Sequence, residues 1–164
     1  MSDSESTYER LVAPIEGQMM RSVWRVTRDV DDAEEAFQNV LANVWQRIET
    51  VEAHPNPHAL ILRMCSQAAW DVVRRRGTRE RHEADAPEEA IPAAADAGAS
   101  PVEAIAQRQL GAELREAIAT LSPNQSAAVT LRYLDELSYD DIALALSCTA
   151  ATAPTRKPCC VWRR

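Results

Sequence analysis

Hydrophobic residues recur at spacings of three and four along most of the chain, a pattern that predicts amphipathic α-helices. The clearest run starts at Asp31, which forms with Glu34 the D-x-x-E pattern of a capping box at a helix N-terminus. Its apolar positions share one face, which we expect to be buried: Ala33, Ala36, Phe37, Val40, Leu41, Val44, Trp45 and Ile48. The opposite face is polar, and such a face is either simply solvated or binds a partner.

Two more helices are predicted on either side of this one. An earlier helix covers residues 8–27, and Pro14 should bend or break its first turns. A later helix begins at Pro57, behind Asn56 as the cap, and runs to about Arg76. The expected buried positions are Leu11, Ile15, Met19, Val23 and Val26 in the earlier helix and Ile61, Met64, Cys65, Ala68 and Val72 in the later one.

A second group of helices is predicted after residue 100. Three helix starts place a serine at the cap and an acid or amide three residues later: Ser100 with Glu103, Ser122 with Gln125, and Ser138 with Asp141. A short helix at 139–146, a turn at 147–149 and another helix from Ala150 have helix-turn-helix spacing, which would present the last helix to a major groove. The expected buried positions are Leu110, Leu114, Ala117, Ile118, Leu121, Ala128, Val129, Leu131, Leu134, Ile142, Ala143 and Leu146.

The segment Glu83 to Ala104 separates the two groups. It holds nine Ala, three Pro and six acids, no basic residue and almost nothing large to bury, so we expect a flexible linker. The predicted fold is all-α: two small helical domains, at 7–82 and 105–164, joined by the linker at 83–104. A single Phe and four Gly argue against a sheet protein.

Charge is unevenly distributed on this acidic chain of net charge -7. From Arg63 to His82 there are six Arg against two acids, and from Thr149 to Arg164 three Arg and one Lys against none. Phosphate neutralisation by basic side chains supplies most non-specific affinity for nucleic acid. The overall charge therefore argues against unaided DNA binding, while the two basic segments leave DNA binding with a partner's help open.

The sequence gives little support for a membrane protein, a metalloprotein or an enzyme. No apolar run approaches the roughly 20 residues of a membrane span, and the acidic N-terminus is unlike a signal peptide, so we expect a cytoplasmic protein without membrane insertion. The four Cys include no C-x-x-C pair, so we expect no metal and no cofactor. No phosphate loop, H-E-x-x-H or nucleophile elbow is present, so we expect no enzyme.

Trp70 lies among arginines on the helix that starts at Pro57. An aromatic ring beside fixed positive charge is what unwound DNA requires for base stacking and phosphate binding. The same pattern also occurs where a helix has a buried aromatic edge and solvated charges, and the spacing alone leaves both interpretations open.

Both halves together resemble a known family, the bacterial RNA polymerase sigma factors, in particular their extracytoplasmic function (ECF) group. Residues 32–40 (DAEEAFQNV) with Trp45, and then residues 59–76, are similar to two stretches of the family's region 2. Residues 121–125 (LSPNQ), 131–133 (LRY) and 137–143 (LSYDDIA) are similar to region 4, in the family's order. The resemblance implies a region 2-like helical bundle and a region 4-like helix-turn-helix domain.

The resemblance also implies partners and sites. The partners would be core RNA polymerase, promoter DNA and an anti-sigma factor. Polymerase would bind Asp32, Glu35, Gln38, Asn39 and Trp45. The minus-ten element would be recognised and opened by Arg63, Gln67, Trp70, Asp71, Arg74 and Arg75. The minus-35 element would be bound by Thr149, Ala151, Thr152, Thr155, Arg156 and Lys157.

Departures from the family pattern concern both domains. Leu60, Gln67 and Asn39 replace the usual Trp, Asn and Glu, which are mild changes. Pro154 and Pro158 follow where the family continues a basic helix, and a proline inside a helix costs around 3 kcal/mol. We therefore expect a shortened recognition helix and impaired minus-35 binding.

Two other interpretations stay open. A stand-alone helix-turn-helix regulator would need a dimer interface and a self-sufficient basic surface, and the sequence indicates neither. A sigma-like adaptor that only sequesters a partner such as an anti-sigma protein is compatible with the proline-containing C-terminus. Binding to core polymerase separates the regulator from a sigma factor, because the regulator should not bind it.

Overall fold

The structure, a computed structural model, describes residues 3–83 and 101–148. Every regular element in those ranges is a helix, which confirms the all-α prediction. The order is α1 (Asp3–Val12), the 3₁₀ helix η1 (Ala13–Ile15), α2 (Glu16–Thr27), α3 (Val30–Gln46), α4 (Ile48–Glu52), α5 (Pro57–Glu83), α6 (Pro101–Ala119), α7 (Pro123–Tyr133) and α8 (Tyr139–Ala145). Helical residues 83 and 101–104 fall inside the expected linker, and residues 84–100 lie outside the described ranges.

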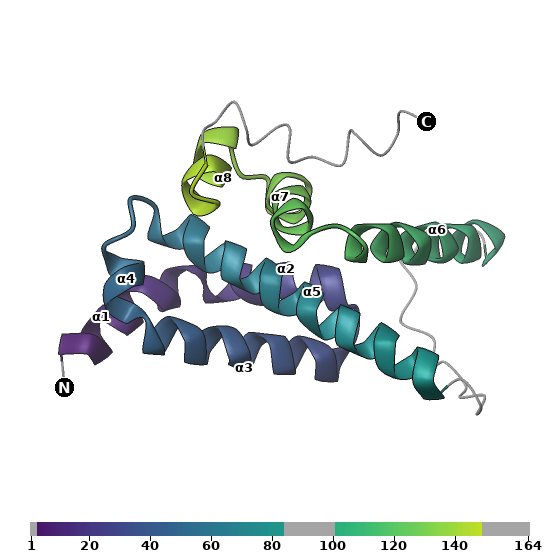
Figure 1. Ribbon diagram of the computed structural model, residues 1–164, viewed down its shortest axis with the longest axis horizontal. Helices are drawn as coiled ribbons and strands as arrows, with labels where there is room; N and C mark the ends of the chain where they lie inside the picture. The colour runs from purple at the N-terminus through teal and green to yellow at the C-terminus, as the bar shows by residue number, and fades with distance from the viewer. Residues whose placement is uncertain (1–2, 84–100, 149–164) are drawn as a thin grey trace.

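The long helix α5 is the axis of the molecule (Figure 1). Helices α2 and α3 pack against it and against each other, and α1 and α4 pack together at one end. Fully buried side chains from each of the three long helices form this core: Met19, Val23 and Val26 of α2, Val40 and Val44 of α3, and Ile61 and Cys65 of α5. The prediction for Pro14 is confirmed, because the 3₁₀ turn η1 interrupts the helix there.

Helix α3 starts slightly earlier than predicted. Asp29, and not Asp31, is the N-cap: its backbone is extended, and its carboxylate accepts a 3.0 Å hydrogen bond from the Asp32 amide. Asp31 and Asp32 lie in the first turn, where negative charge is favourable. Asp29 is followed three residues later by Asp32 and not by Glu or Gln, so the D-x-x-E pattern pointed to Asp31 instead.

The predicted start of α5 is confirmed. Asn56 accepts a 3.0 Å hydrogen bond from the Ala59 amide, and Pro57 is the first helical residue. The helix runs past Arg76 to Glu83, so its predicted end was too early.

The prediction of burial is wrong at four positions, one on α3 and three on α6. Trp45 is 48% exposed, because it lies at the margin of the α3 stripe, where its ring meets Tyr8 edge-on at 5.5 Å. Leu110 and Leu114 are 67% and 56% exposed, and Ala117 is exposed as well. They lie on α6, which projects away from the other helices (Figure 1), so its apolar stripe finds little to pack against in the described structure.

The starts of α7 and α8 follow the predicted serine caps. The Ser122 amide donates a 3.1 Å hydrogen bond to Gln125 Oε1, and Ser138 Oγ accepts a 3.1 Å bond from the Asp141 amide. Leu131, Ile142 and Leu146 are buried as expected. The turn after α8 includes Ser147 in the left-handed conformation, with φ 52°.

Helices α7 and α8 lie directly on α5. Buried side chains of both groups of helices belong to one hydrophobic cluster, which includes Ile61 and Trp70 from α5 and Ala127, Leu131 and Ile142 from α7 and α8. A long face of α5 is therefore covered by the C-terminal helices, which the sequence did not predict.

Replacing Asp29 with Ala should lower the free energy of unfolding by about 1 kcal/mol, because α3 loses its cap. The bond from the Asp32 amide, helped by Arg76 and opposed by burial, holds the pKa of the Asp29 carboxyl below its ordinary value. A group with a lowered folded-state pKa stabilises the fold above its unfolded pKa, and this contribution is lost as the pH falls. In urea unfolding, the penalty of Asp29→Ala should shrink between neutral pH and acid. A penalty independent of pH contradicts this role.

Candidate nucleic-acid interface

The six α5 residues that the resemblance assigns to minus-ten recognition lie on two faces of the helix. At about 100° per residue, Gln67, Asp71 and Arg75 follow one another along one side. Arg63, Trp70 and Arg74 share an adjacent side, which faces α7 and α8. The structure therefore brings each set of three together, and it leaves only the first set open.

The open set borders a hollow of about 330 Å³ between α3 and α5. The residues that line it are Asn39, Val40, Asn43, Arg47, Met64, Gln67, Ala68, Asp71 and Arg75. Asn39, expected on the polymerase-binding face, is thus next to three residues expected to contact DNA. Val40, Met64 and Ala68 give the hollow apolar surface, and the other lining residues carry amide, carboxylate or guanidinium groups, which can hydrogen-bond to base edges.

Ion pairs connect α5, which carries the expected minus-ten residues, to α3, which carries the expected polymerase-binding residues. Arg75 Nη2 lies 2.8 Å from Glu35 Oε1, and Arg76 Nη1 lies 3.0 Å from Asp32 Oδ2 and 3.3 Å from Asp29 Oδ2. The arginines and Glu35 are about half exposed, and such pairs contribute roughly 0–1 kcal/mol each. They can therefore be exchanged for contacts with a partner at little cost.

Trp70 is buried beneath α7. Its side chain is 1% exposed, and its indole Nε1 donates a 2.9 Å hydrogen bond to Thr130 Oγ1. The ring that the sequence indicated for base stacking is therefore inaccessible in this conformation. The sequence left two interpretations of Trp70 open, base stacking on DNA or a buried aromatic side chain. The structure shows the second of these.

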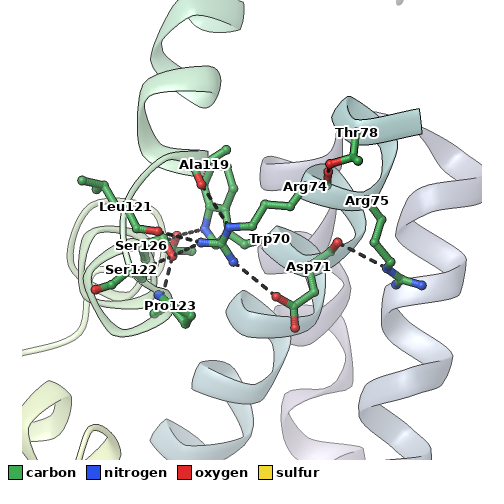
Figure 2. A network of polar contacts seen from close by, with 11 residues as sticks. Trp70, Asp71, Arg74, Arg75, Thr78, Ala119, Leu121, Ser122, Pro123 and Ser126 are labelled. Atoms are coloured by element: carbon green, nitrogen blue, oxygen red, sulfur yellow. Dashed lines mark hydrogen bonds and ion pairs between the residues drawn. The ribbon is translucent and has the colours of Figure 1, made fainter. Parts of the chain in front are cut away.

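Arg74 joins the same contact, as Figure 2 shows. Its Nε donates to the Ala119 carbonyl at 3.0 Å, and its Nη2 donates to the Leu121 carbonyl at 3.1 Å and to Ser126 Oγ at 2.9 Å. Its Nη1 lies 3.2 Å from Asp71 Oδ1. With these partners, the Arg74 guanidinium is held by the end of α6 and the start of α7.

The contact between the two groups of helices extends from Trp70 and Arg74 toward the start of α5 and onto α2. Arg63 Nη1 donates to the Ala145 carbonyl at 2.7 Å, and Asn56 Nδ2 donates to Asp141 Oδ1 at 2.7 Å. Arg25 of α2 also donates to the Leu134 carbonyl. Polar bonds therefore surround the buried cluster along most of the contact.

A partly buried carboxylate lies in the same contact. Asp135 Oδ2 accepts a 2.9 Å hydrogen bond from Ser22 Oγ, whose residue is fully buried. Burial raises the pKa of the Asp135 carboxyl to about 6, against the smaller opposing effects of the Ser22 bond and the charge of Arg25. Sequence reasoning missed Thr130, Ser126 and Asp135, because partners distant in sequence leave no local spacing signal.

The polar face of α3 is accessible. Glu35, Gln38 and Asn39 are exposed, and Trp45 is about half exposed near them along the helix. Asp32 is more enclosed, with its side chain 19% exposed beside Arg76. An exposed row of this kind is available to a partner without rearrangement.

The residues assigned to the minus-35 element lie outside the described ranges: Thr149, Ala151, Thr152, Thr155, Arg156 and Lys157. Within residues 3–83 and 101–148, no group of three or more His, Cys, Asp or Glu side chains is placed to hold a metal ion. No helix in the same part of the chain is both long and apolar enough to cross a membrane.

Comparisons with known proteins agree with this picture. Residues 111–156 match the family described as sigma-70, region 4. The chain is 28% identical over 146 residues to the RNA polymerase sigma-E factor of Streptomyces coelicolor, covering 88% of this chain and 76% of that protein. It is also 28% identical over 150 residues to the ECF RNA polymerase sigma factor SigE of Mycolicibacterium smegmatis, covering 92% of this chain and 57% of the relative.

A solved structure has a similar fold. The sigma factor RpoE of Bartonella quintana, determined in complex with the anti-sigma factor NepR, superposes with a TM-score of 0.56 at 18% identity, covering 91% of this chain and 88% of that one. The likeness extends over nearly all of both chains, so it concerns the overall arrangement and not a single helix-turn-helix.

Asp135→Asn should stabilise the fold at neutral pH. A carboxyl whose folded pKa of about 6 exceeds its ordinary value of 3.8 stabilises the fold in acid, and this contribution is lost as the pH rises through that interval. Wild-type stability should therefore contain a component that falls between these pH values, and Asp135→Asn should remove it. Urea unfolding across that range measures the effect, with the exposed neighbour change Glu136→Gln as the control. Equal pH profiles for wild type and Asp135→Asn would show that this carboxyl does not titrate as described.

Proposed function

We propose how this chain, which belongs to the ECF group of RNA polymerase sigma factors, performs that family's function of directing transcription initiation. Residues 7–82 and 105–164 act as two modules joined by the linker at 83–104. The first module binds core RNA polymerase and opens the minus-ten element, and the second binds the minus-35 element. The observation that carries this assignment is the pairing of an exposed polar face on α3 with an adjacent polar hollow along α5.

Core polymerase is the partner proposed for α3. Glu35, Gln38 and Asn39 are exposed and occupy positions of the family's polymerase-binding helix, with Asn39 in place of the usual Glu. Glu35 holds Arg75 by an exposed ion pair, so a polymerase side chain that binds Glu35 would free Arg75 for a DNA phosphate. Polymerase binding and DNA binding would then assist each other.

Promoter DNA is the ligand proposed for α5. Gln67, Asp71 and Arg75 line the open hollow, where an unstacked base and its phosphate could be bound. Trp70 and Arg74 belong to the same proposed surface, but they become available only when α7 and α8 move off α5. The minus-35 role of residues 149–157 rests on the resemblance and on the family match, which extends to residue 156.

A net charge of -7 fits a protein that binds promoters only as part of a larger complex. Weak intrinsic affinity for phosphates prevents the free chain from occupying DNA, and polymerase supplies the missing contacts. An anti-sigma protein is a further proposed partner, by analogy with the Bartonella quintana protein, whose structure was determined with NepR. The exposed Leu110 and Leu114 of α6 offer an apolar surface for such a partner.

The double substitution Glu35→Ala and Gln38→Ala should weaken binding to core RNA polymerase by about tenfold, because it removes two exposed polar contacts of roughly 0.5–1.5 kcal/mol each. Fluorescence anisotropy of the labelled protein, titrated with purified core enzyme, measures this. Glu49→Ala, also exposed but on α4, is the matched control and should bind as the wild type does. Failure of the wild type to bind core polymerase would contradict the proposed function.

Arg75→Ala should weaken binding of the assembled polymerase complex to promoter DNA and reduce the salt dependence of that binding by about one counterion. The reason is the loss of one phosphate contact beside the hollow. Filter binding at several salt concentrations measures the slope of log affinity against log salt concentration. The promoters are selected from a random library by run-off transcription. Arg21→Ala removes an exposed arginine from α2 and should leave the slope unchanged. Equal slopes for Arg75→Ala and the wild type would remove Arg75 from the DNA-binding surface.

A further inference from the structure

We propose that Trp24 and Arg28, at the end of α2, form with Arg115 of α6 a second binding surface for single-stranded DNA, in which the indole stacks on a base and the two guanidinium groups bind a phosphate. None of these three residues lines the hollow between α3 and α5. The inference rests on the proposed function only for the source of the strand, which is the opened promoter.

Trp24 meets the requirement for base stacking that Trp70 fails. An aromatic side chain can stack on a base only if its ring is accessible, and fixed positive charge nearby binds the adjoining phosphate. Trp70 is 1% exposed, whereas Trp24 is 39% exposed. Arg28 follows Trp24 by four positions, and its amide donates a 3.0 Å hydrogen bond to the Trp24 carbonyl. The ring and the guanidinium therefore start within one helical turn of each other.

Arg28 occupies a backbone position that is costly for arginine. Its φ of 56° lies in the left-handed region, which glycine adopts without the steric penalty that a Cβ brings. Glycine is the usual residue where a helix ends in this way. The local backbone therefore does not account for an arginine here, whereas a binding role for its exposed side chain does.

Positive charge gathers at this surface without a matching acid. Burial, and then the charge of Arg28, lower the pKa of the Arg115 guanidinium, because the two like charges repel each other. Within residues 3–83 and 101–148, neither arginine forms an ion pair, and the neighbouring Asp29 is engaged by the Asp32 amide and by Arg76. A phosphate bound by both guanidinium groups would replace this repulsion with attraction.

Single-stranded DNA matches this surface better than an acidic protein segment does. A carboxylate could pair with the arginines, but it would leave the exposed indole without a partner. Each nucleotide of an unpaired strand carries both a flat base and a phosphate, so it matches the ring and the charges together. In duplex DNA the bases stay inside the stack and are not available to an indole on the protein surface.

Two substitutions remove the proposed contacts, and a third is the matched control. Arg28→Gly removes the guanidinium and relieves the left-handed backbone, so it should raise the melting temperature by about 2–4 °C while it weakens DNA binding. Trp24→Leu removes the ring and keeps an apolar side chain. Arg10→Ala removes the same positive charge from α1, where the side chain is exposed and paired with Glu52, and should leave DNA binding unchanged.

The first readout is fluorescence anisotropy of a fluorescein-labelled strand of about 12 thymidines, titrated with the free full chain at low salt, where phosphate contacts are strongest. Arg28→Gly and Trp24→Leu should each bind at least about fivefold more weakly than the wild type and Arg10→Ala. Absence of binding by the wild type, or equal affinity in all four proteins, overturns the proposal. Displacement of the strand by polyglutamate as effectively as by unlabelled strand also overturns it, in favour of an acidic protein partner.

The second readout is the Trp24 indole proton resonance in nuclear magnetic resonance spectra of the full chain, assigned with Trp24→Leu. Adding the thymidine strand should shift this resonance and leave that of the buried Trp70 in place. A Trp24 resonance that does not move when the strand binds overturns the stacking contact and with it the proposal. Both readouts use the free chain, so failure of the wild type to bind core polymerase would overturn the proposed function separately, and with it only the source of the strand.

Discussion

The packing of α7 and α8 on α5 fixes how the two groups of helices lie together, and the Trp70 indole donates a buried hydrogen bond to Thr130 within it. This bond joins residues 60 positions apart in sequence, and it lies in the apolar cluster shared by α5, α7 and α8. A buried donor without an acceptor costs roughly 1–3 kcal/mol, so the two groups of helices must keep their register for this bond to survive. Arg74, one turn further along α5, extends the same contact to the end of α6 and the start of α7.

This contact makes α5 a helix with two occupied sides and one open side. The core of α2 and α3 packs on one side, α7 and α8 on another, and the polar hollow with Gln67, Asp71 and Arg75 lies between them. Because α3 contributes both to the hollow and to the proposed polymerase-binding face, a ligand on either surface would affect the ion pairs of Arg75 and Arg76. A factor built this way has a physical reason to bind polymerase and promoter together.

Much of the fold could be predicted from local sequence. The helices, the caps at Asn56 and Ser138 and the interruption at Pro14 depend on residues within a few positions of each other, so spacing reveals them. The cap of α3 was displaced by two residues, because neighbouring aspartates compete for the same role. The exposure of Leu110 and Leu114 was missed, because an apolar stripe predicts burial only where another element covers it.

Part of the site could also be predicted, because some of its residues are close together in sequence. The polar face of α3, and Asn39, Gln67, Asp71 and Arg75 as site residues, follow from helical periodicity combined with the family resemblance. The burial of Trp70, the four-partner setting of Arg74 and the raised pKa of Asp135 follow from contacts between segments far apart in the chain, and no local pattern encodes them. The residues that hold the two groups of helices together are therefore those that only the three-dimensional structure brings together.

Single-molecule energy transfer between dyes on α3 and α6, at Glu34→Cys and Glu113→Cys, tests most directly whether α7 and α8 lie on α5 in the free protein and move off it when polymerase binds. Both positions are exposed; Cys148, Cys159 and Cys160 would be replaced by Ser, and Cys65 is fully buried. We expect one high-transfer population in the free protein and a shift to low transfer when core RNA polymerase is added. Transfer that is already low in the free protein, or that polymerase leaves unchanged, would contradict it.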